Sequence, residues 1–431
     1  MDQFLSTYSP RCRVTVRDLA TGKARPIGPR LDGDITDDVL TLTTAKAYGR
    51  AAGTFQIVLA YRIMPNGQTY ANAIIPDDIV SIELDAGDGN GMQMAMLGLV
   101  DRPARSFTAV DGIPQRSVKL SGQDLGKLLQ RHRIGWDIAG AQVQIPGQGE
   151  SPVTRIMNSY MRRVPLQVKT PPDLCEVLLT MALDDMSKIS PTIRFNDQSA
   201  DDWILWDDSM AFIRDTTAWD AMKRAEHDPV NTLTTETTGP NSFEVRLEPT
   251  PIGNDGKLAT AIEHTIQDVD IVMEDVGVCD AERINLLCYW PTIYQLAVSG
   301  QVDIVMANPD LTQFDQDSIR QHGYCVKIIQ DDFNTPDVKT GLDKNAEQKV
   351  AALAIPKAKM FWEWYRRNHE LESGTYTVHL SPQIRAGHGL LVKQRSGAAM
   401  EYLIEQVTHQ CTFAGTPQFI TSLQVTRGQK R

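Results

Sequence analysis

Acidic side chains in adjacent pairs are the residues of this sequence most suited to catalysis. Two carboxyl groups on either side of a glycosidic bond can act as general acid and as base or nucleophile, which is glycosidase chemistry. Adjacent carboxylates more often lie on a solvated face or in a loop. We therefore predict no catalytic residue and keep glycoside hydrolysis as an alternative. The pairs are Asp184-Asp185, Asp201-Asp202, Asp207-Asp208 and Asp331-Asp332.

Ligands for a metal ion or a cofactor are sparse. The stretch GDGNG at 87–91 lacks the Asp-x-Asp-x-Asp spacing and the closing glutamate of a calcium loop, so it indicates a hairpin tip. Cys411 beside His409 has no companion ligands, which favours a buried thiol over a zinc site. No HExxH, no Gly-x-Ser-x-Gly and no glycine-rich phosphate loop is present. We expect no metal site, no cofactor and no enzymatic activity.

Composition limits the class of protein further. The 431 residues carry a formal net charge of −11 and show no long basic run, which argues against binding nucleic acid through its phosphates. The six cysteines form no CxxC and no close pairs, as expected for reduced and mostly buried thiols. An N-terminal signal region and a run of about 20 apolar residues are both missing. We expect synthesis in a cytoplasm and no membrane insertion.

Two aromatic clusters are candidates for contacts with partner proteins. Trp203 and Trp206 lie among four aspartates, and Phe361, Trp362 and Trp364 lie among basic residues. Tryptophan and neighbouring arginine are common in interface hot spots. The alternative for both clusters is a hydrophobic core, with long cations lying around the cluster at 361–365.

Periodicity predicts a chain made mainly of strands, in two regions. Residues 1–125 alternate with period two and are interrupted by turn residues, as are residues 374–428, and 258–330 is also strand-rich. A helix is expected at 123–133 with Ser121 near its start as a cap, and a long helix at 343–369 with a kink at Pro356. In the middle, the sequence predicts helices at Ser151-Pro152 and around 174–181. Thr217-x-x-Asp220 resembles a capping box.

The end of the chain echoes the end of the first strand-rich region. Residues 99–123 read as a strand, a polar loop and an alternating strand that ends in Gly122-Gln123, and residues 406–429 repeat this, ending in Gly428-Gln429. Ile75-Pro76 before one strand is matched by Ser381-Pro382 before another. The echo predicts two similar β-domains, and three such chains would then present six similar domains in a ring.

Four stretches together resemble the baseplate hub proteins of contractile phage tails, a group that includes late control proteins and the hub part of secretion-system spikes. They are AYGRAAGTFQIVL (47–59), IPDDIVSI (75–82) with GLVD (98–101) and LSGQDL (120–125), TAWDAM (217–222) with DP (228–229) and VRLEPTP (245–251), and LIEQVTH (403–409) with VTRG (425–428). Each motif is short, and their order along the chain carries the resemblance.

The resemblance implies an α+β, mainly β fold in a ring-forming homotrimer, with two tube-like β-barrel domains and inserted mixed α/β domains. The expected parts are a first barrel (1–125), a mixed insert (126–240), a strand-rich part of the second barrel (241–335), a long helical segment (336–372) and C-terminal strands completing the second barrel (373–431).

By the same resemblance, the protein would be a structural hub of the tail baseplate. It would join the tail tube protein to the trimeric spike protein, contact the tape measure protein and other baseplate proteins, and surround a channel through which DNA only passes. It would reside in the virion after assembly in the host cytoplasm. Two alternatives are a cell-wall-degrading tail enzyme and a distal-tail or receptor-binding adaptor of a non-contractile phage.

Overall fold

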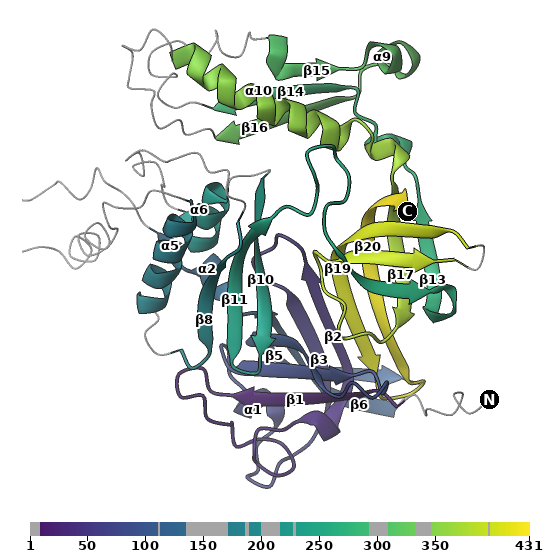
Figure 1. Ribbon diagram of the computed structural model, residues 1–431. Helices are drawn as coiled ribbons and strands as arrows, with labels where there is room; N and C mark the ends of the chain where they lie inside the picture. Colours follow the sequence, from purple (N-terminus) through teal and green to yellow (C-terminus); the bar gives the residue numbers. More distant parts are fainter. Residues whose placement is uncertain are drawn as a thin grey trace, which may run out of the picture.

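The computed structural model describes residues 9–110, 113–134, 171–185, 189–199, 216–226, 230–292, 309–332, 346–394 and 397–431. Within these residues a curled 12-stranded sheet forms the body of the molecule (Figure 1). Its strands come from residues 11–124, 262–277 and 372–430, while the segments between them form two three-stranded sheets, one two-stranded sheet and helices. The prediction of a mainly β protein is confirmed.

The sheet consists of two repeats of six strands. The N-terminal repeat contains β1 (Arg11–Arg17), β2 (Val39–Ala47), β3 (Thr54–Ala60), β4 (Ile79–Asp85), β5 (Gln93–Val110) and β6 (Ile113–Asp124). The C-terminal repeat contains β12 (Ile262–Gln267), β13 (Ile271–Gly277), β17 (Glu372–His379), β18 (Gly389–Lys393), β19 (Ala399–Thr412) and β20 (Gln418–Lys430).

Both repeats have the same strand order. The N-terminal repeat runs β1-β4-β5-β6-β3-β2 and the C-terminal repeat runs β12-β18-β19-β20-β17-β13. In each, the first strand pairs with the fourth, and a 3₁₀ turn precedes the second strand: η1 (Thr36–Asp38) and η3 (Asp268–Asp270). One pairing differs, since β1 is antiparallel to β4 whereas β12 is parallel to β18. The echo in the sequence therefore reflects a duplicated topology.

Backbone hydrogen bonds fix which residues correspond. Val100 accepts from Asp77 and donates to Asp78 (2.8 and 2.9 Å), and Ile404 makes the same two bonds with Gly387 and His388 (2.8 and 3.0 Å). A bulge follows Val100 and Ile404 in the two strands. Val100 thus corresponds to Ile404.

The residue match that the sequence suggests is wrong by three positions. It pairs Val100 with Val407 and Gly122 with Gly428, whereas the strand pairing places Gly122 at Val425, because Gly122 pairs with Val100 and Val425 pairs with Ile404. The Gly-Gln dipeptides match by chance, since β20 continues to Lys430 through a bulge that β6 lacks.

Each repeat buries the apolar side chains of its alternating strands. In β1, Cys12, Val14 and Val16 are buried against the core of the N-terminal repeat. The C-terminal repeat has its own core, in which Tyr376 and Tyr402 pack edge to face at 5.6 Å. The period-two pattern of the sequence thus places these strands correctly.

A mixed α/β part packs on the N-terminal repeat. Its strands β8 (Thr192–Asp197), β10 (Asn231–Gly239) and β11 (Ser242–Pro249) form one sheet, in which β11 is parallel to β8. It also contains α5 (Pro171–Asp185), α6 (Ala218–Ala225), and the short strands β7 (Arg133–Ile134) and β9 (Thr216–Thr217). Its core is shared with side chains of β4 and β5.

The helix expected at 123–133 is much shorter. It is α2 (Lys127–Arg131), and its N-cap is Gly126, not Ser121. Ser121 lies in β6, where it pairs with both β3 and β5. Pairing on both sides extends the strand to Asp124, and the Asp124 carboxylate then accepts from Gly126 N at 2.9 Å at the start of the helix.

A second small part lies beyond the sheet (Figure 1). It consists of β14 (Leu286–Thr292), β15 (Thr312–Phe314), β16 (Val326–Asp332), α9 (Gln316–His322) and the long helix α10 (Ala346–Tyr365). The long helix is confirmed, with Pro356 inside it. The helix expected from Ser151-Pro152 lies outside the described residues. The remaining short elements are α1 (Tyr70–Ala73), η4 (Asp280–Glu282), η5 (Pro309–Leu311) and η6 (Asn368–Glu370).

Thr217→Ala is expected to lower the free energy of unfolding by about 1 kcal/mol. Thr217 is the N-cap of α6 and accepts from Asp220 N at 3.1 Å, as the sequence predicts. Alanine would leave this N–H without its partner. Urea unfolding of the two proteins measures the effect, with Thr217→Ser as a control that keeps the hydroxyl; equal stability of all three proteins would contradict the capping role.

Candidate functional site: the joint between the repeats

The two repeats are joined edge to edge by strands β2 and β19. Their antiparallel pairing runs from Thr41 opposite Thr412 to Ala47 opposite Gln406. Beyond its two ends, Phe413 N donates to Leu40 O at 2.9 Å and Tyr48 N donates to Glu405 O at 2.8 Å. The pairing makes one sheet of the two repeats, so it fixes their relative orientation.

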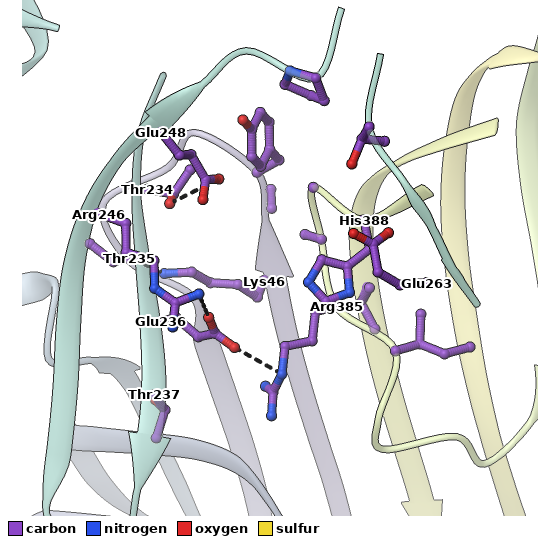
Figure 2. Close-up of a pocket in the computed structure, with 18 of the residues that line it drawn as sticks. Lys46, Thr234, Thr235, Glu236, Thr237, Arg246, Glu248, Glu263, Arg385 and His388 are labelled. Atoms are coloured by element: carbon purple, nitrogen blue, oxygen red, sulfur yellow. Dashed lines mark hydrogen bonds and ion pairs between the residues drawn. The ribbon is translucent and has the colours of Figure 1, made fainter. Parts of the chain in front are cut away.

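A polar cavity of about 500 Å³ lies beside this joint (Figure 2). All three neighbouring parts of the molecule line it: the N-terminal repeat, the mixed part and the C-terminal repeat. Its charged and histidine lining residues are Lys46, Asp124, Glu236, Arg246, Glu248, Glu263, Arg385, His388 and His409.

Glu236 connects the mixed part to the C-terminal repeat. Its carboxylate lies between two guanidinium groups (Figure 2): Arg246 from the neighbouring strand β11, and Arg385, whose Nε is 2.9 Å from Glu236 Oε1. Glu236 and Arg385 are both about three-quarters buried (23% and 29% exposed), so this ion pair is less screened by solvent than a surface pair.

Lys46 connects the N-terminal repeat to the mixed part. Its ammonium lies 2.6 Å from the buried carboxylate of Asp124 and donates to the Thr235 hydroxyl at 2.5 Å. Thr235 in turn donates to Ala51 O at 2.7 Å. Lys46 belongs to β2, so the strand that forms the joint also holds the mixed part in place.

Burial shifts the pKa of several groups around the cavity. It raises the pKa of the Glu248 carboxyl and lowers the pKa of His264 to about 4. It also lowers the pKa of His388, whose Nδ1 lies 2.9 Å from Nε2 of His264. His409, nearly fully buried beside Thr421, has its pKa lowered to about 4 in the same way.

The cavity is better suited to holding three parts together than to catalysis. Glu236 is held by two arginines, and Glu263 accepts from Gly389 N at 2.8 Å. A glycosidase needs one carboxyl free to give a proton and a second free to attack or to activate water. Glu248 has a raised pKa and accepts a long bond of 3.3 Å from the Thr234 hydroxyl, so it meets the first condition best. The second condition is not met, because Asp124, like Glu236 and Glu263, is held by hydrogen bonds or ion pairs.

His409→Gln is expected to weaken the pH dependence of stability between about pH 6.5 and pH 4. The folded-state pKa of His409 is about 4, below that of an exposed histidine. In this pH range the unfolded chain therefore binds the extra proton, and stability falls as the pH falls. Urea midpoints at pH 7 and pH 5 measure the loss in each protein. Equal losses in the wild type and the variant would contradict this role for His409.

Of the predicted partner-contact residues, Trp203 and Trp206 lie outside the described residues. Phe361 and Trp364 are buried in the core of the small part that contains α10, whereas Trp362 is half-buried at its margin. This burial favours the core interpretation for the cluster on α10. A contact between these residues and a partner stays a prediction.

Other predicted features are also placed by the structure. The stretch at 87–91 forms the tip between β4 and β5, and Cys411 packs in the core of the N-terminal repeat. The six cysteines form no disulfide with one another; Cys12, Cys175 and Cys411 are buried, but Cys279 is exposed. The side chains of the four acidic pairs lie outside the described residues.

Glu236, Arg246 and Arg385 are cavity residues that no sequence pattern predicted. Glu236 and Arg246 are single charges in alternating strands, and Arg385 is far away in sequence, so only the tertiary structure brings them together. A signal was present in β10, where Glu236 interrupts a run of threonines.

Two solved structures with similar folds are tail proteins. One is the tail protein from Neisseria meningitidis MC58 (12% identity, TM-score 0.53), and the other is the 43 kDa tail protein of prophage MuSo2 from Shewanella oneidensis (14% identity, TM-score 0.50). In both cases the match covers 97% of each chain. No protein-family model and no curated protein matches the sequence. The resemblance to tail proteins is therefore confirmed at the level of the fold.

The described residues contain no group of three or more His, Cys, Asp or Glu side chains placed to hold a metal ion. None of the helices in the described ranges combines the length and the apolar character needed to cross a membrane.

Proposed function

We propose that this chain is a structural ring subunit of a phage-type tail, the central hub of its baseplate. The observation that supports this most directly is the duplicated topology: two repeats of one strand order, joined by β2 and β19. A closed ring made of three such chains would contain six similar units. It could therefore match a threefold partner on one side and a sixfold partner on the other.

In this proposal each repeat forms a tube-like barrel domain, and the three chains surround an axial channel. The ring joins the tail tube protein to the trimeric spike protein and contacts the tape measure protein and other baseplate proteins. DNA passes through the channel without being bound, which fits the formal net charge of −11. The protein would then be found in the virion, at the baseplate of a contractile tail.

Immunogold labelling of intact particles tests the hub assignment. An antibody against this chain is expected to mark the tail end that lies away from the capsid, at a single position on the axis. Labelling along the whole tube, or on peripheral fibres, would contradict the assignment and would favour the adaptor of a non-contractile tail instead.

The alternative of a cell-wall-degrading enzyme is supported by one observation, the raised pKa of Glu248 in the cavity. The hub proposal expects no clearing of peptidoglycan in a gel by the purified chain. Clearing that is lost in Glu248→Gln, and kept in the control Glu244→Gln on the same strand, would establish the enzyme and overturn the non-enzymatic assignment.

A further inference from the structure

We propose that the free edge of β13 pairs with the free edge of β5 in a second copy of this chain. This pairing would repeat between chains the joint that β2 and β19 form within one chain. The inference rests on the ring proposed above and adds to it the strands, the register and the residues that close the ring.

The outer half of β5 has a partner on one side only. Its pairing with β4 ends at Leu99, whereas its pairing with β6 continues to Val110. Within the described residues, no strand and no loop backbone pairs with the other side of 102–110. The segment also contains Pro103, and proline in a sheet is largely confined to edges and bulges.

The corresponding segment of the C-terminal repeat is covered. It is the outer half of β19, from Gln406 to Thr412, and β2 pairs with all of it. In the described residues, no strand pairs with β5 at the positions where β2 pairs with β19. The strand of the C-terminal repeat that corresponds to β2 is β13, the second strand in each repeat's order of sequence.

The edge of β13 is open as well. In the described residues it pairs only with β17, and five of its seven residues, Val272 to Asp275 and Gly277, are exposed. Val272 and Met273 expose 52% and 56% of their surface, and Phe107 on the open half of β5 exposes 63%. Exposed apolar side chains at strand edges favour pairing with another chain.

By contrast, the edge of β1 is protected by its own chain. Val14 and Val16 of β1 hydrogen-bond to the loop that follows: Ile35 N donates to Val14 O, and Val16 N donates to Gly33 O, at 3.0 and 2.8 Å. Among the described residues the chain thus covers the edge of β1, but it leaves one side of the outer half of β5 and one side of β13 without a backbone partner.

Bulges set the register on the β13 side. β2 has a bulge between Val39 and Thr41, directly after the 3₁₀ turn η1. β13 has a bulge between Ile271 and Met273, directly after the 3₁₀ turn η3. Met273 therefore corresponds to Thr41.

Bulges also set the register on the β5 side. Arg102 follows the bulge in β5 as Gln406 follows the bulge in β19, so Thr108 corresponds to Thr412. Because Thr41 lies opposite Thr412 in the joint, Met273 of one copy would lie opposite Thr108 of the next.

The charges of the two edges are complementary in this register. β5 offers Arg102 and Arg105 with no acid up to Val110, and β13 offers Glu274 and Asp275 with no base. Arg105 would lie diagonal to Glu274 on one face, a spacing at which long side chains of opposite charge interact. In the described residues the Arg105 guanidinium donates to the side chain of Asn72, and the Glu274 carboxylate accepts from the Tyr376 hydroxyl at 3.1 Å. Neither bond uses the backbone groups of the two edges.

Disulfide cross-linking tests the register. In this register Ser106 of one copy lies directly opposite Asp275 of the next. With Cys279→Ser to remove the exposed native thiol, the pair Ser106→Cys and Asp275→Cys is expected to shift the oxidised protein from one chain to three on a non-reducing gel. The control pair, Ser106→Cys and Glu274→Cys, places the second thiol on the opposite face of β13 and is expected to stay at one chain.

Mixing the two single-cysteine proteins shows that the bond joins different chains, since only two-chain products are then expected. Equal cross-linking of both cysteine pairs would overturn the register. A ring of three chains by mass without any cross-link would overturn the edge pairing and leave the hub proposal standing. A chain that stays single at every concentration would overturn both.

Charge reversal provides a second test. Glu274→Lys would place a cation beside Arg105 and is expected to weaken ring assembly by roughly threefold or more at each joint. The control Glu176→Lys makes the same change of charge at an exposed position of α5, on neither of the two edges, and is expected to leave ring assembly unchanged. Equal assembly of the two variants would contradict the contact between Glu274 and Arg105.

Discussion

Replacing Asp124 with alanine is expected to lower the free energy of unfolding by about 3–5 kcal/mol. Asp124 is 2% exposed, and its carboxylate accepts from Gly53 N at 2.7 Å and Gly126 N at 2.9 Å and pairs with Lys46 at 2.6 Å. Alanine would leave the two backbone N–H groups without an acceptor and the Lys46 ammonium without a carboxylate partner in a mostly buried place. The effect is large because β2, β6 and α2 all meet at this one carboxylate.

Urea unfolding measures the loss, and Asp101→Ala is the matched control. Asp101 pairs with Lys127 at 2.5 Å, but it is 35% exposed, so a change of about 0–1 kcal/mol is expected. The double variant Lys46→Met with Asp124→Asn should recover part of the loss, since it removes the unpaired charge. A loss for Asp124→Ala no larger than that for Asp101→Ala would contradict the central place of Asp124.

Trp364→Ala is expected to destabilise the small part that contains α10 by about 3–5 kcal/mol. Trp364 is 6% exposed and packs edge to face on Phe361 at 5.9 Å, and its indole N–H donates to Gly253 O at 2.7 Å. Alanine would leave a cavity and would leave Gly253 O without this donor. Hydrogen exchange of the α10 amides measures the local loss.

Trp362→Ala is the matched control for this prediction, because Trp362 lies on the same helix but is half-buried at the margin of the core. It should cost clearly less stability. If Trp364→Ala left hydrogen exchange unchanged and reduced only the binding of a partner, Trp364 would be a partner anchor and the core interpretation would be wrong.

Most of the fold was predictable because the relevant patterns are local. The burial of β1 follows from the alternation of neighbouring residues, and the start of α6 follows from Thr217 and Asp220, three positions apart. The errors came from features that depend on distant residues. Ser121 has the chemistry of a helix cap, but β3 and β5 pair with it on both sides and keep it in a strand. The echo of the two repeats was found in the sequence, but only hydrogen bonds at Val100 and Ile404 give its register.

The site was less predictable than the fold. Glu236 and Arg385 are 149 positions apart (385 − 236), and no periodicity links them. The open edges of β5 and β13 are likewise invisible in the sequence, because an edge is defined by a missing neighbour and not by a residue type. The aromatic cluster on α10 shows the converse: Phe361 and Trp364 have the composition of an interface, but they fill a core.

The mass of the purified 431-residue chain in solution distinguishes a ring of three chains from every other assembly. A stable species of three times the chain mass of 47.9 kDa is expected. A chain that stays single at every concentration, or a closed assembly of six chains, would contradict it.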